Sequence, residues 1–415
     1  MGLVIGTPKE IRRRAELCPE PGEGRGVAVG IDPSRAALQM ALLSPHGDKP
    51  RKRRVPLGPG AVKELEELLQ EACPEPVEGG DAVIAMEGSH STGQLFLLQL
   101  LERGHDVREV HPFVSKRFRE MLTEEHTDEK DAEGLALMAL WKRDLPVVRF
   151  SQEQATCKRL SRLREQLVQD RTRYLSRLHA CLSETYGASY KGLFRHLTAK
   201  KALHFFQQYP TINDALAGDP DVPLQVGAEA WERLQQAGCW QEGSYLRCLR
   251  AEVRTLATHV LALKDRVREA EREMTKIPTT PQVQLLLTMP QVGPITAMTI
   301  AGNTGDVSRF GGDVHRYVAY CGLAPTTHQS GGGEPMTRPR HRYNRHLKRA
   351  YLFLAFNQAR LNPRAREYYQ RKRREGKNHW TALRALARHL CRIVFRMLSR
   401  IKPYQEVIRD PQPAP

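Results

Sequence analysis

Nine apolar residues between positions 246 and 274 recur at spacings that alternate between three and four without a break. The stripe consists of Leu246, Leu249, Val253, Leu256, Val260, Leu263, Val267, Ala270 and Met274. Such heptads are typical of a coiled-coil helix, because the repeat keeps one apolar face toward a partner helix. An earlier helical stripe runs through Leu160, Leu163, Leu167, Tyr174, Leu178 and Leu182. The two helices could pair as a hairpin or join two protomers, and the sequence leaves both possibilities open.

The region before these helices has a different pattern, in which short apolar strands alternate with amphipathic helices. Strands are predicted at residues 27–32, 37–43, 81–86 and 107–110, and helices at 61–71, 95–101 and 113–122. This alternation predicts an α/β layer with crossover connections. The basic run Lys49–Arg54 is predicted as a loop, which is either a solvated turn or a nucleic-acid contact.

Acidic residues follow two of these strands directly. Asp32 ends the run Gly-Val-Ala-Val-Gly-Ile-Asp, and Glu87 ends the strand at 81–86. Further on, Thr127 is a good helix N-cap, and Asp128 and Asp131 share one face of the helix that follows. Acids in a first helical turn are also favoured by the helix dipole alone.

Taken together, the four acids suggest more than capping. Two strand-end acids and an i,i+3 pair within one α/β domain are what a site for two Mg²⁺ ions requires. The oxygen ligands suit Mg²⁺, and four carboxylates offset the charge of two such ions. The sequence therefore predicts a metal-dependent nuclease site at Asp32, Glu87, Asp128 and Asp131.

The C-terminal third is predicted to be helical. The turn Pro290–Pro294 resembles that of a helix-hairpin-helix element, in which Gly293 would permit the bend and helix amides would face a phosphate. A helix is expected at 310–323, followed by a glycine-rich loop in which Ser330 precedes three glycines. A serine in this setting is usually part of a flexible loop, although backbone there can approach a phosphate closely.

The net charge of +17 is concentrated near the C-terminus. Residues 338–402 contain 20 Lys and Arg against Glu367 and Glu375, which leaves the remaining chain close to neutral. Arginines recur every fourth residue along the last helix, at Arg384, Arg388, Arg392, Arg396 and Arg400. Like charges at this spacing destabilise an isolated helix, so the track indicates an anionic partner, nucleic acid before membrane.

Composition excludes several other classes. No apolar run approaches the roughly 20 residues of a membrane span, and no signal peptide is visible. The eight cysteines contain no Cys-x-x-Cys pair, which argues against a disulfide framework or a zinc knuckle. We therefore expect a reduced, cytoplasmic protein that associates with the nucleoid.

The ordered motifs resemble one family. Gly-Ile-Asp32, Met-Glu87-Gly, Thr-Asp128-x-x-Asp131-Ala, the coiled-coil middle, Pro-Gln-Val-Gly-Pro-Ile-Thr-Ala and Gly-Leu-Ala-Pro before Ser330-Gly are similar, in order and spacing, to the insertion sequence 110 transposases. The resemblance covers residues 26–400. Two positions depart from the family pattern downstream of Ser330, where Tyr343 replaces a glycine and Lys348 an arginine, and Asn303 stands where an acid is common.

The resemblance implies a RuvC-like (RNase H-like) domain at 26–150, a coiled-coil and helical region at 151–278, and a helical transposase domain at 279–403. Tails would occupy 1–25 and 404–415. It also implies an Asp-Glu-Asp-Asp site with Mg²⁺, and a Ser330 nucleophile that forms a covalent phosphoserine link. The expected partners are double-stranded DNA at the element ends and target, a structured guide RNA, and further copies of the chain in a dimer or tetramer. The remaining nucleic-acid contacts are expected at Gly293, Arg338, Arg340, Arg342, Arg345, Lys348, Arg384, Arg388, Arg392 and Arg396.

Three other functions stay open at the level of sequence. A DNA invertase of the Piv/MooV type would work without a guide RNA. A plain metal-dependent junction nuclease would not need Ser330. A domesticated nucleic-acid-binding protein would not need Asp32, and the intact set of carboxylates weighs against it.

Overall fold

The structure, a computed structural model, describes residues 27–44, 49–72, 82–87, 92–122, 125, 127–142, 145–149, 151–328, 336–338 and 343–405. Of 326–328 and 336–338 it describes the backbone alone. The chain divides into two compact units. The first contains residues 1–152 together with 305–312, and the second contains 153–304 together with 313–415.

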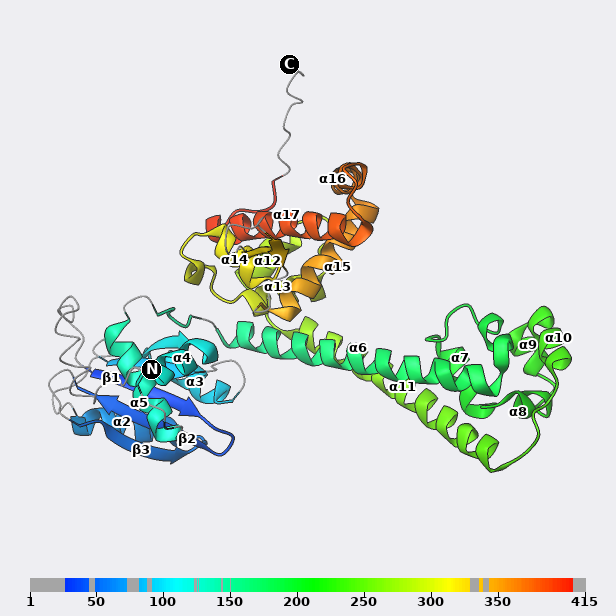
Figure 1. Ribbon diagram of the computed structural model, residues 1–415, viewed down its shortest axis with the longest axis horizontal. Helices are drawn as coiled ribbons and strands as arrows, with labels where there is room; N and C mark the ends of the chain where they lie inside the picture. Colours follow the sequence, from blue (N-terminus) through cyan, green and yellow to red (C-terminus); the bar gives the residue numbers. More distant parts are fainter. Residues whose placement is uncertain are drawn as a thin grey trace, which may run out of the picture. The chain divides into compact units, whose positions relative to one another are not determined.

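The first unit is built on a five-stranded sheet (Figure 1). Its strands are β1 (Val27–Pro33), β2 (Ala37–Leu43), β3 (Arg51–Pro56), β4 (Ala82–Glu87) and β5 (Asp106–Val110), in the order β3-β2-β1-β4-β5. The first three strands pair antiparallel, whereas β1–β4 and β4–β5 pair parallel. The strand predicted at 37–43 is confirmed, and it forms a hairpin with β1. The predicted basic loop at 49–54 was wrong, because most of it forms the edge strand β3.

Two basic residues of β3 form ion pairs with acidic residues of the neighbouring helices. Lys52 pairs with Glu129 and Glu133, and Arg53 pairs with Glu64 and Glu71. These ion pairs account for much of the positive charge of the strand within the first unit. They favour a structural role for these two side chains over a nucleic-acid contact.

Helices cover both faces of the sheet. On one face, alternate residues of β1 and β2 pack with α2 (Ala61–Ala72) and α3 (Gln94–Glu102) in the larger apolar core. On the other face, the intervening residues Ala28, Val83 and Ala85 pack with Leu135 and Met138 of α5 (Asp128–Trp141). Helix α4 (Pro112–Leu122) lies beside α5. A mixed sheet of this order, with helices on both faces, is an RNase H-like fold, as predicted.

The second unit contains the two long helices. They are α6 (Gln152–Thr185) and α11 (Ser244–Lys276), which run antiparallel along each other. Contacts at both ends show this arrangement: Arg164 pairs with Glu271, and Glu184 accepts a hydrogen bond from Tyr245. Eight of the nine heptad residues of α11 are buried within this single chain, and Leu263 is half-buried. Of the two arrangements that the sequence left open, the structure therefore has the hairpin.

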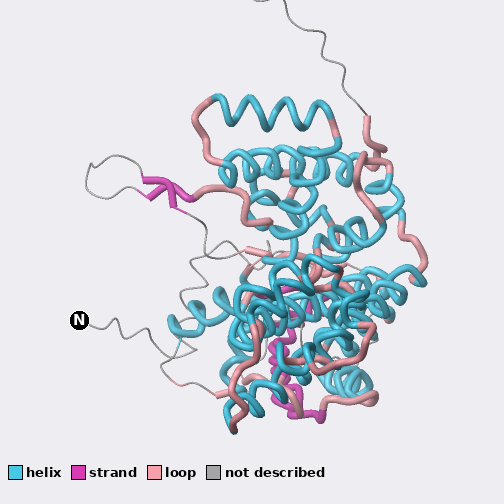
Figure 2. The backbone as a smooth tube through the Cα atoms, turned by 90° about the vertical axis from the view of Figure 1, so that its right-hand side faces the viewer, coloured by secondary structure: helices cyan, strands magenta, loops and turns pink. Residues whose placement is uncertain are grey.

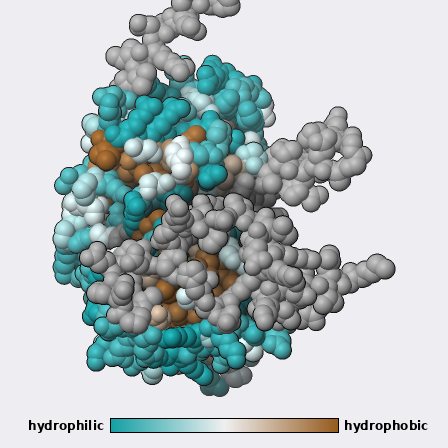
Figure 3. All heavy atoms as spheres, turned by 90° about the vertical axis from the view of Figure 1, so that its left-hand side faces the viewer, coloured by the Kyte–Doolittle hydropathy of each residue, from teal (hydrophilic) through white to brown (hydrophobic). Residues whose placement is uncertain are grey.

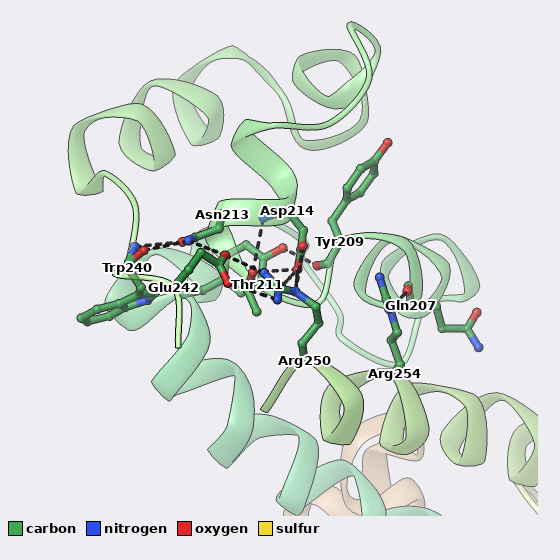
Figure 4. A network of polar contacts seen from close by, with 10 residues as sticks. Gln207, Tyr209, Thr211, Asn213, Asp214, Trp240, Glu242, Arg250 and Arg254 are labelled. Atoms are coloured by element: carbon green, nitrogen blue, oxygen red, sulfur yellow. Dashed lines mark hydrogen bonds and ion pairs between the residues drawn. The ribbon is translucent and has the colours of Figure 1, made fainter. Parts of the chain in front are cut away.

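Short helices fill the connection between the long ones. They are η1 (Gly187–Gly192), α7 (Lys200–Gln208), α8 (Ile212–Leu216), α9 (Val222–Val226) and α10 (Ala228–Ala237). A polar network ties α7, α8 and the segment that precedes α11 to that helix (Figure 4). Arg250 donates from Nε to both carboxylate oxygens of Asp214, at 2.9 and 3.0 Å, and from Nη2 to Glu242 at 2.9 Å. Asp214 also completes a capping box with Thr211, so one carboxylate joins α8 to the hairpin.

The C-terminal helices are α12 (Pro281–Leu287), α13 (Pro294–Thr304), α14 (Val314–Tyr320), α15 (Arg345–Leu361), α16 (Pro363–Arg374) and α17 (His379–Arg400). The helix predicted at 310–323 is shorter than expected, because η2 (Val307–Phe310) and a turn precede α14. The strands β6 (Thr326–His328) and β7 (Met336–Arg338) form a hairpin that stands apart from these helices (Figure 2). None of the described helices is long and apolar enough to cross a membrane.

Two detailed expectations for this region were wrong. Helices α12 and α13 do form a hairpin, but the residue with a left-handed backbone in their connection is Gln291, with φ of 62°, and not Gly293. The apolar pattern of the last helix also predicts a buried Ile401, but this residue follows the end of α17 with φ of 51° and is 79% exposed.

Candidate active site

Two of the predicted acids lie at neighbouring strand ends. Ile31 of β1 is paired with Met86 of β4 in a parallel register, so Asp32 and Glu87 each come one residue later at the same edge of the sheet. Both side chains are half-buried. Parallel strands bring their carboxyl ends to one edge, which is where ligands bind in α/β sheets.

Helix α5 brings the other two acids to this edge. Thr127 caps the helix by accepting a hydrogen bond from the Lys130 amide at 3.3 Å, as predicted, and Asp128 and Asp131 follow in the first turn. Helix α5 packs directly across β1 because Gly30 has no side chain. A Cβ built there would lie 2.0 Å from the carbonyl oxygen of Ala132 and 2.4 Å from the Ala136 nitrogen. This glycine thus sets how closely Asp131 approaches Asp32.

The four carboxylates interact electrostatically. The pKa of Asp32 is raised to about 6, first by burial and then by the negative charges of Glu87, Asp131 and Asp128, in that order. Arg119 lowers that pKa and partly offsets the effect. Carboxylates gathered in this way repel one another unless a cation joins them.

Helix α4 contributes two contacts to these acids that the sequence analysis missed. The Ser115 hydroxyl donates a hydrogen bond to Glu87 Oε2, and Arg119 Nη1 forms an ion pair with Asp131 Oδ1. The signal that could have found them is their spacing of four residues in the helix that follows β5. Without the sheet order, nothing in the sequence shows that this face of α4 turns toward the acids.

The residues fit a divalent metal in their chemistry. All four side chains offer oxygen, the ligand that Mg²⁺ prefers, and the negative charges of Glu87, Asp128 and Asp131 add to burial in raising the pKa of Asp32. Within the part of the chain that the structure describes, no three acidic, His or Cys side chains already converge as ligands of one ion. Two of the acids are instead held by Ser115 and Arg119, so ligation requires these side chains to reorient.

Several predicted site residues lie outside the described residues. Ser330 falls in the chain segment between β6 and β7, and Arg340 and Arg342 fall between β7 and α15. Arg338 ends β7 and is described by its backbone alone. The nucleophilic role of Ser330 therefore stays a prediction.

The basic residues of the C-terminal helices do not form one uniform surface. Arg345, Arg384 and Arg396 are exposed, as a nucleic-acid contact requires. Arg388 and Arg392, by contrast, are half-buried, and Arg388 Nε donates a hydrogen bond to the Leu323 carbonyl at 2.8 Å. Arg388 thus has an internal structural contact that its place in the arginine track did not predict. Hydrophilic residues make up most of the coloured surface of the face in Figure 3.

The structure accommodates the two departures downstream of the serine loop. Tyr343 lies against Gly322, where a Cβ would come within 2.5 Å of the ring, and the Lys348 ammonium lies 4.2 Å from the centre of that ring. Asn344 then begins α15, and its Oδ1 accepts from the amides of His346 and Leu347. Tyr343 and Lys348 therefore form one packed cation–π pair beside the helix start.

Asn303 is a buried junction in the second unit. Its side-chain nitrogen donates to the Ser161 hydroxyl at 3.1 Å, and its side-chain oxygen accepts from Arg162 Nε at 3.3 Å. Its backbone carbonyl accepts from Asn344 Nδ2 at 3.4 Å. Burial lowers the pKa of Arg162. An amide at this position links α6, α13 and α15 without a charge of its own.

Comparison with protein families gives two matches. Residues 29–187 match a model of a transposase domain named for its DEDD residues and for IS110. Residues 283–370 match a model described as a transposase of the IS116/IS110/IS902 family. The two matches cover the sheet with its acids and the C-terminal helices, and they leave residues 188–282 between them.

Curated proteins of insertion elements are similar over most of the chain. An uncharacterized 44.8 kDa protein of IS116 from Streptomyces clavuligerus is 29% identical, over 66% of this chain and 71% of its own. Uncharacterized proteins of IS110 from Streptomyces coelicolor and of IS900 from Mycobacterium paratuberculosis are 25% and 28% identical. These alignments cover 91% and 90% of this chain, and 95% of each relative.

One solved structure is also similar in part. It is that of T. thermophilus RuvC in complex with a Holliday junction substrate, with 17% sequence identity and a TM-score of 0.20. The match covers 28% of this chain and 94% of that one.

Proposed function

Because this chain belongs to the IS110/IS116/IS902 family of transposases, we propose that it cleaves and exchanges DNA strands at Asp32, Glu87, Asp128 and Asp131 with a serine nucleophile. The observation that supports this most is the electrostatic coupling of the four acids around Asp32. An RNase H-like sheet brings them together from three separate elements.

Asp32, Glu87, Asp128 and Asp131 would hold Mg²⁺ in this proposal. When bound, Mg²⁺ polarises the scissile phosphate and neutralises the charge that develops on its oxygens. The protein's own contribution is position: the strand ends fix Asp32 and Glu87, and the capped start of α5 fixes Asp128 and Asp131. Ser115 and Arg119 hold two of these acids from α4.

Ser330 is the nucleophile that we propose. Its hydroxyl oxygen forms a bond to phosphorus while the bond from phosphorus to a deoxyribose oxygen breaks, which leaves a phosphoserine link and a free DNA hydroxyl. The serine proton passes to a base, and the departing oxygen takes up a proton. A serine needs such activation because its own pKa leaves it a poor nucleophile.

The partners follow from the same proposal. Exposed Arg345, Arg384 and Arg396 would contact DNA at the element ends and target, or a structured guide RNA. The acids of one copy and Ser330 of another copy would form a shared site in a dimer or tetramer. A protein of this kind works on DNA in the cytoplasm, at the nucleoid.

The experiment that tests the metal site uses full-length protein, its native flanking DNA and Mg²⁺. We expect strand cleavage that is lost with EDTA and in Asp32→Asn, but retained in Asp170→Asn, a half-buried acid of α6 in the second unit. Cleavage that survives in Asp32→Asn would contradict the proposed site. Sequencing of RNA that co-purifies tests the guide: a defined structured RNA supports it, and random RNA argues for a guide-free invertase.

A further inference from the structure

Helix α4 holds two of the four acids by different kinds of contact. Ser115 and Arg119 are four residues apart, so they lie on one face of the helix. Ser115 is a neutral donor to Glu87 of β4, whereas Arg119 carries a full positive charge to Asp131 of α5. The first contact orients a carboxylate, and the second also neutralises one.

Arg119 is well placed to act as a counter-ion. Its side chain is 15% exposed and that of Asp131 is 21% exposed, so their pairing is screened less than a surface ion pair. Its Nε atom is buried and has no hydrogen-bond partner in the described part of the chain. The guanidinium is thus only partly satisfied by Asp131.

The basic side chains Lys52 and Lys130, near or on α5, form ion pairs with other acids. Lys52 pairs with Glu129 and Glu133, and Lys130 pairs with Glu133. Neither pairs with Asp128 or Asp131 among the described contacts. Arg119 is therefore the side chain whose charge competes most directly with a cation for the proposed ligands.

We propose that Arg119 is a positioning residue that forms an ion pair with Asp131 in the metal-free protein and is displaced from it when a divalent cation binds. This inference rests on the proposed metal site. Arg119 stabilises the cluster of acids before metal arrives, and it lowers the affinity for the metal in return. Ser115 has the opposite effect, since its hydroxyl orients Glu87 without competing for the ion.

The two residues therefore predict opposite changes in metal affinity. Arg119→Gln should bind Mn²⁺ about tenfold more tightly, the size of the repulsion between a single and a double positive charge about 6 Å apart in water. Arg119→Lys keeps the charge and should stay near wild type. Ser115→Ala should bind about tenfold or more weakly, as is usual when a residue that orients a ligand is lost.

The experiment counts free Mn²⁺ by electron paramagnetic resonance during titration of the full-length protein. Arg117→Gln is the matched control, because Arg117 lies in the same helix, is exposed and has its guanidinium over the Phe113 ring. It should change the affinity less than twofold. Arg119→Met, which also loses the charge, replaces Arg119→Gln if that variant does not fold.

The outcomes distinguish the role of Arg119 from the proposed metal site. Tighter binding in Arg119→Gln but not in Arg119→Lys supports the inference. Unchanged or weaker binding in Arg119→Gln, with binding still lost in Asp32→Asn, overturns the inference and leaves the proposed site standing. Mn²⁺ binding that persists in Asp32→Asn overturns the proposed site itself, and the inference with it.

Discussion

Gly30→Ala is the smallest change that should disturb the proposed site without touching an acid. The new methyl group would lie 2.0 Å from the Ala132 carbonyl oxygen and 2.9 Å from Leu135 Cβ. Ordinary contact begins at 3.4 Å, so α5 would have to recede by about 1.4 Å. Backbone atoms cannot rotate away as a flexible side chain can.

The expected cost follows from that displacement. Overpacking in a well-packed core costs about 1–3 kcal/mol, and contact with backbone places this case at the upper end or beyond. Because Asp131 directly precedes Ala132, the same shift moves it away from Asp32. We expect the affinity for Mn²⁺ to fall about tenfold or more.

Chemical denaturation and Mn²⁺ titration measure the two effects. The control is Gly134→Ala in the same helix, where an added Cβ meets nothing within 4 Å. There the unfolding free energy should rise by up to about 1 kcal/mol, because alanine is the better helix former. If Gly30→Ala matched Gly134→Ala in stability and metal affinity, close packing of α5 on β1 would not position the acids.

Three further predictions concern the second unit. Arg250→Ala should cost about 1–3 kcal/mol by leaving Asp214 and Glu242 without their shared partner, and hydrogen exchange over 207–243 should rise while that of the first unit stays unchanged. Asn344→Ala should cost about 1 kcal/mol or more in thermal or chemical unfolding, because it removes the α15 cap and the hydrogen bonds that Nδ2 donates to the Asn303 carbonyl and to Tyr320. Burial and then Arg392, Arg396 and Arg371 lower the pKa of His389, so its contribution to stability is present above the ordinary histidine pKa and lost as the pH falls below it. NMR titration should find this low pKa, and a rise on adding duplex DNA; no rise would argue against phosphates beside these arginines.

Much of the fold could be predicted from the sequence because the sequence signals for these elements are local. The apolar strands, the capped start of α5 and the heptads of α11 all depend on residues close together in the chain, and the structure confirms them. The failures depended on distant partners. Lys49–Arg54 looked like a solvated loop because the acids that pair with β3 lie on α2 and α5.

In the candidate site, too, residues with a local sequence signal were predicted and residues that depend on distant contacts were missed. Asp32 and Glu87 were found from strand ends, and Asp128 and Asp131 from a helix start. Ser115 and Arg119 were missed, since only the packing of α4 beside α5 turns them toward the acids. Arg388 was expected to face an anion, and its contact with Leu323 depends on how α17 packs.

In the proposed function, the carboxylates and Ser330 serve one reaction. A denaturing gel of full-length protein incubated with its native flanking DNA and Mg²⁺ tests this most directly. We expect a covalent protein–DNA adduct in the wild type that is lost in both Ser330→Ala and Asp32→Asn. An adduct that persists in Ser330→Ala, or DNA cleavage without any adduct, would contradict it.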